Sequence, residues 1–217
     1  MPLVRKPPPK AAVEARNEAS LKATRLDQAR LAAMLLDGSE DERWDAARAA
    51  GEAPGGVAML SEAVSRESVP HIREAIFTAL ARIRTPESAE AVLKYLRSDD
   101  SSIRTGALDA LRAMPDAVAA SIPRLLRDAD ADVRLLACEL VRNQPVADAG
   151  RMLAEVLATE PEANVCAAAV EVVSEAGGPE LLPLLAACAA RFPNDPFLAF
   201  AVQVASERIG SQASTHD

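Results

Sequence analysis

Histidines and aromatic side chains are scarce in this sequence, and this scarcity argues against both a metal site and a β-sheet fold. Only 3% of the 217 residues are aromatic, whereas Ala and Leu dominate, a balance that favours closely packed helices. The only histidines are His71, expected on the surface at a helix start, and His216, in a polar tail. No His-Glu or His-Asp metal cluster can be assembled from them. We predict no catalytic residues, metal or cofactor.

Excess positive charge and long apolar runs are also missing. The formal net charge is -8, so the chain lacks the basic surface on which affinity for nucleic acid depends. No run of about 18 apolar residues appears, and the basic start MPLVRKPPPK is not followed by the apolar segment of a signal peptide. We expect a cytoplasmic protein that binds neither nucleic acid nor membrane.

Cysteines and glycines occur without the spacings that carry chemistry. Cys138, Cys166 and Cys188 have no Cys-x-x-Cys spacing, and each lies in an Ala/Leu/Val-rich helical stretch. The Gly/Pro clusters at 54–56 and 177–179 fall at breaks between helices, where these residues are expected, and form no phosphate-binding loop. We expect free thiols with a structural role.

An internal repeat is the main positive signal. Arg43, Arg73, Arg104 and Arg134 are separated by 30, 31 and 30 residues, each near the start of an apolar helical pattern. The apolar pattern continues through 160–209, where the arginine is lost. A fixed period of this length is typical of stacked helical repeats.

Each repeat reads as a helical hairpin. Ile103, Ala107 and Leu111 lie on one helical face, Pro115 ends that helix, and residues 116–126 carry a second apolar face. A hairpin of two such short helices cannot bury both faces alone, so consecutive hairpins must stack.

The repeats resemble the HEAT-repeat family, in particular the short bacterial variety of phycobilin lyases, whose pattern is Leu-Leu-x-Asp-x-Asp-x-x-Val-Arg. The best match is LLRDADADVR at 125–134, through Asp128, Asp130, Val133 and Arg134. YLRSDDSSIR at 95–104 has Ser98 at the first Asp position. The resemblance covers roughly residues 31–209 and implies a solenoid, a scaffold that hosts many unrelated functions.

We therefore predict an all-α fold, an α-solenoid of about five to six HEAT-like hairpins in a single domain at 11–210. A Pro-rich disordered tail is expected at 1–10, a capping helix at 11–36 and a polar disordered tail at 211–217. The repeats are expected near 37–64, 68–96, 98–126, 128–157, 160–188 and 191–209.

The repeated arginines are expected to be structural. Arg73, Arg104 and Arg134 are predicted to join carboxylates such as Asp100 and Asp130 in a ladder between repeats, because a charged group at a packed interface needs an opposite charge. The alternative is that these arginines bind a ligand.

A second charged set lies on the second helices, which line the concave surface of HEAT-like solenoids. It comprises Glu90, Lys94, Arg97, Arg124, Arg127 and Arg151. Aligned across repeats, these side chains could form a basic stripe that selects an acidic partner. The alternative is an ordinary solvated face.

Three of the four phenylalanines, Phe192, Phe197 and Phe200, cluster near the C-terminal end. A terminal repeat normally has a polar outer face, so this cluster is a candidate interface for a partner or for a homodimer. Packing in the core of the last hairpin is the alternative.

Together these features predict a non-catalytic scaffold or adaptor that binds another protein, in a regulatory or signalling setting in the bacterial cytoplasm. The resemblance to phycobilin lyases implies an alternative, a lyase-like or chromophore-chaperone subunit. Only Trp44, Tyr95 and Phe77 offer aromatic rings to line a bilin pocket.

Overall fold

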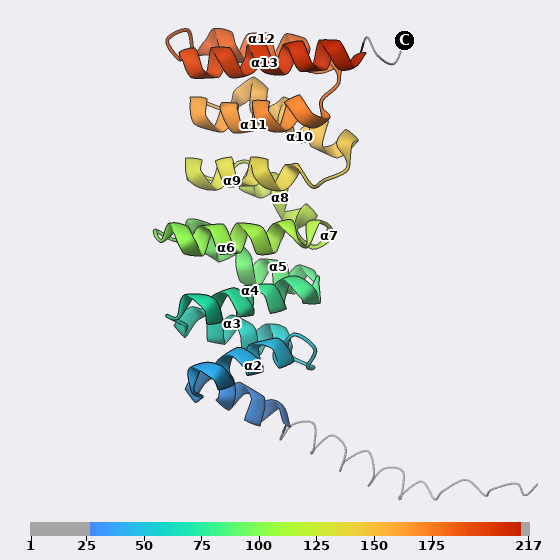
Figure 1. Ribbon diagram of the computed structural model, residues 1–217. Coiled ribbons are helices and arrows are strands. Elements are labelled where there is room, and N and C mark those ends of the chain that lie inside the picture. The colour runs from blue at the N-terminus through green and yellow to red at the C-terminus, as the bar shows by residue number, and fades with distance from the viewer. Residues whose placement is uncertain (1–26, 214–217) are drawn as a thin grey trace, which may run out of the picture. The chain divides into compact units, whose positions relative to one another are not determined.

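The computed structural model describes residues 27–213, which form helices and connecting turns with no strand in that range (Figure 1). The predicted tail at 1–10 and most of the predicted capping helix lie outside the described residues, as do residues 214–217. Contacts divide the chain after Ile83 into two compact units. This division falls inside the predicted repeat 68–96.

The first unit is a set of helices packed against one another. It contains the helical residues 27–37 followed by α2 (Glu40–Ala50), α3 (Gly56–Arg66) and α4 (Pro70–Ile83). α2 begins at a capping box in which Ser39 and Glu42 bond each other's backbone amides. α4 packs against both α2 and α3. Leu60, Ile72 and Leu80 are fully buried in this unit.

Two glycines shape the tight turn between α2 and α3. Gly55 has a φ of 75°, and a Cβ added there would meet nothing within 4 Å. A Cβ on Gly56 would lie 1.9 Å from the carbonyl oxygen of Ala50. The first position therefore requires glycine for its backbone angle and the second for space.

We expect Gly56→Ala to lower the free energy of unfolding by about 2–3 kcal/mol, because the backbone at Ala50 must move. Gly55→Ala is the matched control, and its left-handed backbone should cost only about 1 kcal/mol. Urea unfolding followed by circular dichroism measures both. A larger loss for Gly55→Ala than for Gly56→Ala would contradict this account of the turn.

The second unit stacks its helices in two layers (Figure 1). The first helices of its repeats are α6 (Ser101–Arg112), α9 (Ala131–Val141), α11 (Ala163–Ala176) and α13 (Pro196–Ala213). These lie side by side, with α11 packed between α9 and α13. The other layer contains α5 (Pro86–Leu93), η1 (Lys94–Arg97), α7 (Pro115–Val118), η2 (Ala119–Ser121), α8 (Ile122–Leu125), α10 (Val146–Thr159), η3 (Pro179–Leu181) and α12 (Leu182–Arg191).

Residues 98–126, 128–157 and 160–188 each contain a first helix, α6, α9 or α11, followed by a second helical segment. The second helix of repeat 98–126 is broken into α7, η2 and α8, and Pro115 and Pro123 each lie in the first turn of a helical piece. The predicted last repeat contributes one helix, α13. This helix extends to Ala213, beyond the predicted start of the tail at residue 211.

The core of the second unit lies between the two layers. Its largest fully buried side chains include Leu111, Ile122, Leu153, Leu157 and Leu185. Burying each of these side chains contributes about 1.5–3 kcal/mol to the favourable free energy of stacking.

Candidate functional site

The repeated arginines bond to the backbone that precedes their own helices. Arg73, Arg104 and Arg134 each donate from Nη1 to the carbonyl oxygen six residues earlier, at 3.2, 2.6 and 2.8 Å respectively. Arg43 reaches the carbonyl of Gly38 at 2.9 Å. Each arginine therefore bonds the backbone of the linker that precedes its own helix. The arginines recur about every 30 residues because each occupies the same structural position in its repeat.

The carboxylate partners of these arginines differ from those expected. Asp100 and Asp130 are helix N-caps, each accepting a hydrogen bond from a backbone amide two residues later. They therefore do not pair with Arg73, Arg104 or Arg134. Their short side chains instead accept hydrogen bonds from backbone amides that have no partner within the helix.

Glutamates from the following linker form the ion pairs instead. Arg134 donates from Nε and Nη2 to both oxygens of Glu160, each at 2.8 Å. Arg43 makes the equivalent pair with Glu67, its Nε lying 2.8 Å from Oε2. Glu160 also accepts from the amide of Glu162. Arg43 and Arg134 are thus each paired with a glutamate before the next repeat, whereas within residues 27–213 Arg73 and Arg104 bond backbone carbonyls only.

The ionised form of Glu160 is strongly held. Burial alone would raise its pKa, but the hydrogen bonds from Arg134 and from the amide of Glu162 outweigh burial and hold the pKa below its usual range. The same balance, with Arg43 as the donor, lowers the pKa of Glu67. This is the signature of a structural ion pair, in which both groups keep their charges.

Arg191 takes over where the repeated arginine is lost. Cys166 stands at that position, and its thiol lies 3.7 Å from the carbonyl oxygen of Glu160. Arg191, from α12 of the same hairpin, donates to that carbonyl at 2.9 Å and to the carbonyl of Leu157 at 2.8 Å. A residue on the second helix therefore replaces the missing one, a substitution that the arginine spacing could not reveal.

All three cysteines are free and buried. Burial raises the pKa of Cys138 to about 12. The hydrogen bond from Cys166, aided by the nearby Arg191, holds the pKa of Cys188 below its usual value. Because the Cys138 and Cys188 side chains are fully buried, they pack as small apolar side chains.

The charged set on the second helices is paired internally. Arg124 bonds Glu90, Arg127 bonds Glu155, Arg97 bonds Asp128 and Arg151 bonds Asp148. Lys94 lies over the ring of Tyr95. Each arginine of the predicted stripe thus has a carboxylate within the second unit.

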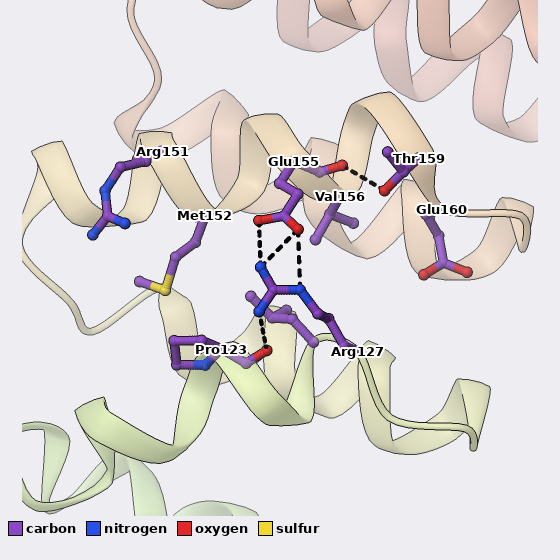
Figure 2. A pocket seen from close by; sticks show the side chains of 9 residues that line it. Pro123, Arg127, Arg151, Met152, Glu155, Val156, Thr159 and Glu160 are labelled. Carbon is purple, nitrogen blue, oxygen red and sulfur yellow. Dashed lines mark hydrogen bonds and ion pairs between the residues drawn. The ribbon is translucent and has the colours of Figure 1, made fainter.

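Figure 2 shows how this pairing fills the space between α8 and α10. Arg127 reaches across to both carboxylate oxygens of Glu155, at 2.7 and 2.8 Å from Nη2, and donates to the carbonyl of Pro123. The hollow left beside it has a volume of about 100 Å³. An acidic partner here would have to displace carboxylates that the chain already supplies.

The opposite layer carries a larger and mostly apolar hollow, which we call the α11 groove. Its volume is about 490 Å³. It is lined by Leu135 and Glu139 of α9, by Asn164, Ala167, Ala168, Val170, Glu171 and Ser174 of α11, and by Phe197, Phe200, Ala201, Val204 and Ala205 of α13. Because α11 packs between α9 and α13, its side chains form the middle of the lining, which we call the floor, and those of α9 and α13 flank it.

The exposed wall of this groove is unusually apolar. Phe197 and Phe200 are 70% and 64% exposed, and Val204 is 45% exposed. They recur at i, i+3 and i+7 on one face of α13, while the opposite face buries Leu198 and Ile209. Grouped exposed apolar side chains of this kind are often found at interaction surfaces.

These positions refine the sequence prediction for the phenylalanines. Phe197 and Phe200 are not core residues, and they open onto the layer of first helices beside α11. Phe192 is half-buried at the end of α12 and stacks with Arg191, whose Cζ lies 5.5 Å from the ring centroid. The structure brings together two of the three predicted phenylalanines with Val204 of the same apolar segment, and adds Glu171, which sequence reasoning missed.

The aromatic residues considered for a bilin pocket have different surroundings. Phe77 is buried in the core of the first unit, and Tyr95 belongs to the second unit. Trp44 lines a hollow of about 330 Å³ between α2 and α4, where Arg48 stacks on its ring. One exposed ring gives little of the apolar enclosure that a cofactor site requires.

Residues 27–213 contain neither a metal-ion site nor a membrane-spanning helix. No group of three or more His, Cys, Asp or Glu side chains within this range could hold a metal ion. No helix in the same range is long and apolar enough to cross a membrane.

Comparisons with known proteins agree with the helical architecture. The family model for HEAT repeats matches residues 28–112. The chain is similar to a structure from a study of microtubule plus end tracking by XMAP215, CLIP-170 and EB1, with 14% identity and a TM-score of 0.56 over 82% of this chain and 89% of that chain. The chain has a HEAT/armadillo-like repeat fold.

Other comparisons of this repeat fold are weaker. A designed armadillo repeat protein in complex with the peptide (KR)4 shares 17% identity, with a TM-score of 0.41 over 83% of this chain and 98% of that chain. No curated protein matches the sequence. The comparisons therefore show the fold, whereas the function depends on the residues exposed on its surface.

Proposed function

We propose that this chain is a non-catalytic protein-binding module that contacts its partner through the α11 groove. The observation that carries the proposal is the group of Phe197, Phe200 and Val204, exposed together on the wall of a 490 Å³ hollow. Repeat folds of this type commonly serve as interaction scaffolds, because stacked hairpins present an extended preformed surface.

The energetics favour this surface over the second-helix face. Covering an exposed phenylalanine gains about 1.5–3 kcal/mol, and rigid aromatic residues at the centre of an interface supply most of its affinity. Arg124 and Arg127, in contrast, lie in exposed ion pairs, and exchanging one carboxylate partner for another gains little. An acidic partner on that face is therefore the weaker candidate.

Site-specific photo-crosslinking in cells of the source organism tests the proposal. We expect p-benzoylphenylalanine in place of Phe200 to form a covalent adduct with a partner protein. The matched control carries it in place of Val146, which has the same exposure of 64% but lies at the start of α10. Mass spectrometry of the adducts identifies the partner and the contacting segment.

The control at Val146 distinguishes binding at the α11 groove from binding at the start of α10. An adduct at Val146 without one at Phe200 would move the binding surface away from the α11 groove and refute the proposal. Where the partner is captured, Phe200→Ala should weaken its affinity by about 30-fold, equivalent to about 2 kcal/mol.

A further inference from the structure

We infer that the segment filling the α11 groove is a basic amphipathic α-helix of another protein. This inference rests on the proposed function and names the chemistry of the partner. Three features of the groove support it: the sign of its charges, the exposure of one carboxylate and the small side chains of its floor.

The charges that line the groove are of one sign. Glu139 and Glu171 are its ionisable residues, and no lining residue is a cation. Glu139 is bonded by Arg112 at 2.6 Å. Arg142 lies outside the lining and is shared among Glu139, Glu171 and Glu175. Carboxylates thus outnumber the arginines that serve them at this edge.

Glu171 is the carboxylate best placed to meet a partner. Its side chain is 66% exposed, and its contact with Arg142 is long, at 3.4 Å. Arg142 bonds Glu175 more closely. A lysine or arginine from a partner could therefore bond Glu171 while Arg142 keeps Glu175. Complementary charge of this kind fixes the orientation of a docked segment and excludes acidic competitors.

The floor of the groove suits a helix. Asn164, Ala167, Glu171 and Ser174 span about three turns of α11, or about 15 Å. Ala167 and Ser174 are small enough to let another backbone approach closely, and the flanking helices contribute the larger Leu135 and Phe200 to the lining. Small residues flanked by larger apolar ones suit an amphipathic helix, which inserts apolar residues at i, i+3, i+4 and i+7 into a groove of this kind.

A second copy of this chain fits the groove less well. A two-fold symmetric contact presents the same patch from both partners, so Glu171 of each copy would approach the same acidic edge of the other. Like charges brought together at an interface weaken binding, and the whole chain carries a net charge of -8.

Synthetic peptides test the inference directly. The probe is a fluorescein-labelled amphipathic peptide of about 18 residues, or about five helical turns, with leucine on one face and lysine on the other. The comparison peptide has glutamate at every lysine position. We expect fluorescence anisotropy with the full chain to show at least about tenfold tighter binding of the lysine peptide.

Variants of the chain establish where the peptide binds. Glu171→Lys should weaken the lysine peptide by about tenfold or more, and Phe200→Ala by about 30-fold. Glu155→Lys, which changes the same charge on exposed α10, should leave the affinity within about twofold. Circular dichroism melting should show that all three variants remain folded, because each changed side chain is largely exposed.

The outcomes separate this inference from the proposed function. An adduct at Phe200 combined with equal or tighter binding of the glutamate peptide would overturn the inference and leave the proposed function intact. Equal loss in Glu155→Lys and Glu171→Lys would reduce the binding to general charge attraction and also overturn it. Sedimentation showing a dimer that Phe200→Ala dissociates would replace the helix with a second copy.

Discussion

Arg134→Ala should lower the free energy of unfolding by about 3–5 kcal/mol, the cost expected when one partner of a buried ion pair is removed. The Arg134 and Glu160 side chains are only 11% and 4% exposed. Without the guanidinium, the Glu160 carboxylate stays buried without its strongest partner, and the carbonyl of Asp128 loses its donor. Urea unfolding of the full chain measures the loss.

Arg127→Ala is the matched control for this prediction. Arg127 and Glu155 form the same bidentate pair between consecutive repeats, but their side chains are 61% and 55% exposed. Truncation there should cost at most about 1 kcal/mol. Equal losses in the two variants would show that burial does not set the strength of the ladder.

The contribution of the Glu160 carboxylate to stability should also depend on pH. Because the folded-state pKa of Glu160 is lowered, its ionisation stabilises the fold above the unfolded-state pKa, about 4.3 for a glutamate. This contribution disappears as the pH falls through the lower folded-state value. The difference in stability between the unmodified chain and Glu160→Gln should therefore be largest near neutral pH and should shrink below about pH 4.

Leu157→Ala should lower the free energy of unfolding by about 2–5 kcal/mol, because a fully buried leucine leaves a cavity when truncated. Leu157 lies on α10 in the core of the second unit. The side chains around it belong to neighbouring helices whose spacing is fixed by many other contacts, so the cavity can collapse only in part. Chemical denaturation at constant pH measures the loss.

Phe200→Ala provides a revealing comparison, because it removes more carbon atoms than Leu157→Ala. With 64% of Phe200 exposed, the free energy of unfolding should change by less than about 0.5 kcal/mol. A loss comparable to that of Leu157→Ala would place Phe200 in the core and remove the basis of the α11 groove.

The hairpins and the positions of the ladder arginines could be predicted from the sequence, because both follow from local periodicity. Ala107 and Leu111 repeat at helical spacing, and both are fully buried. Pro115 ends the first helix of its hairpin, since proline both lacks the amide and restricts the residue before it. Signals of this kind need no knowledge of the neighbouring repeat.

The carboxylate partners could not be predicted, because they depend on where one hairpin returns relative to the next. Glu160 lies 26 residues after Arg134, closer to a full repeat than to a helical turn. Asp130 looked more suitable because it is near in sequence and in the family pattern. Its side chain is taken by the adjacent helix terminus, a competition that only backbone geometry reveals.

The α11 groove could not be predicted from the sequence either, because α13 is apolar on two faces. Leu198 and Val202 follow one helical stripe, and Phe197 and Phe200 follow another. Periodicity alone cannot say which stripe is buried. The small residue Ala167 on α11 leaves room beside the second stripe, and that relationship joins helices about 30 residues apart in sequence.

The Arg134–Glu160 pair indicates that the boundary between two repeats lies after residue 160 and not after residue 157. The hairpin at 128–157 contains Arg134 but not Glu160, whereas a segment ending after residue 160 contains both halves of the pair. Arg191 binds the carbonyls of Leu157 and Glu160, so this junction is held from both directions. Shortened or recombined versions of the chain should therefore be cut after the glutamate, so that each fragment keeps its own counter-ion.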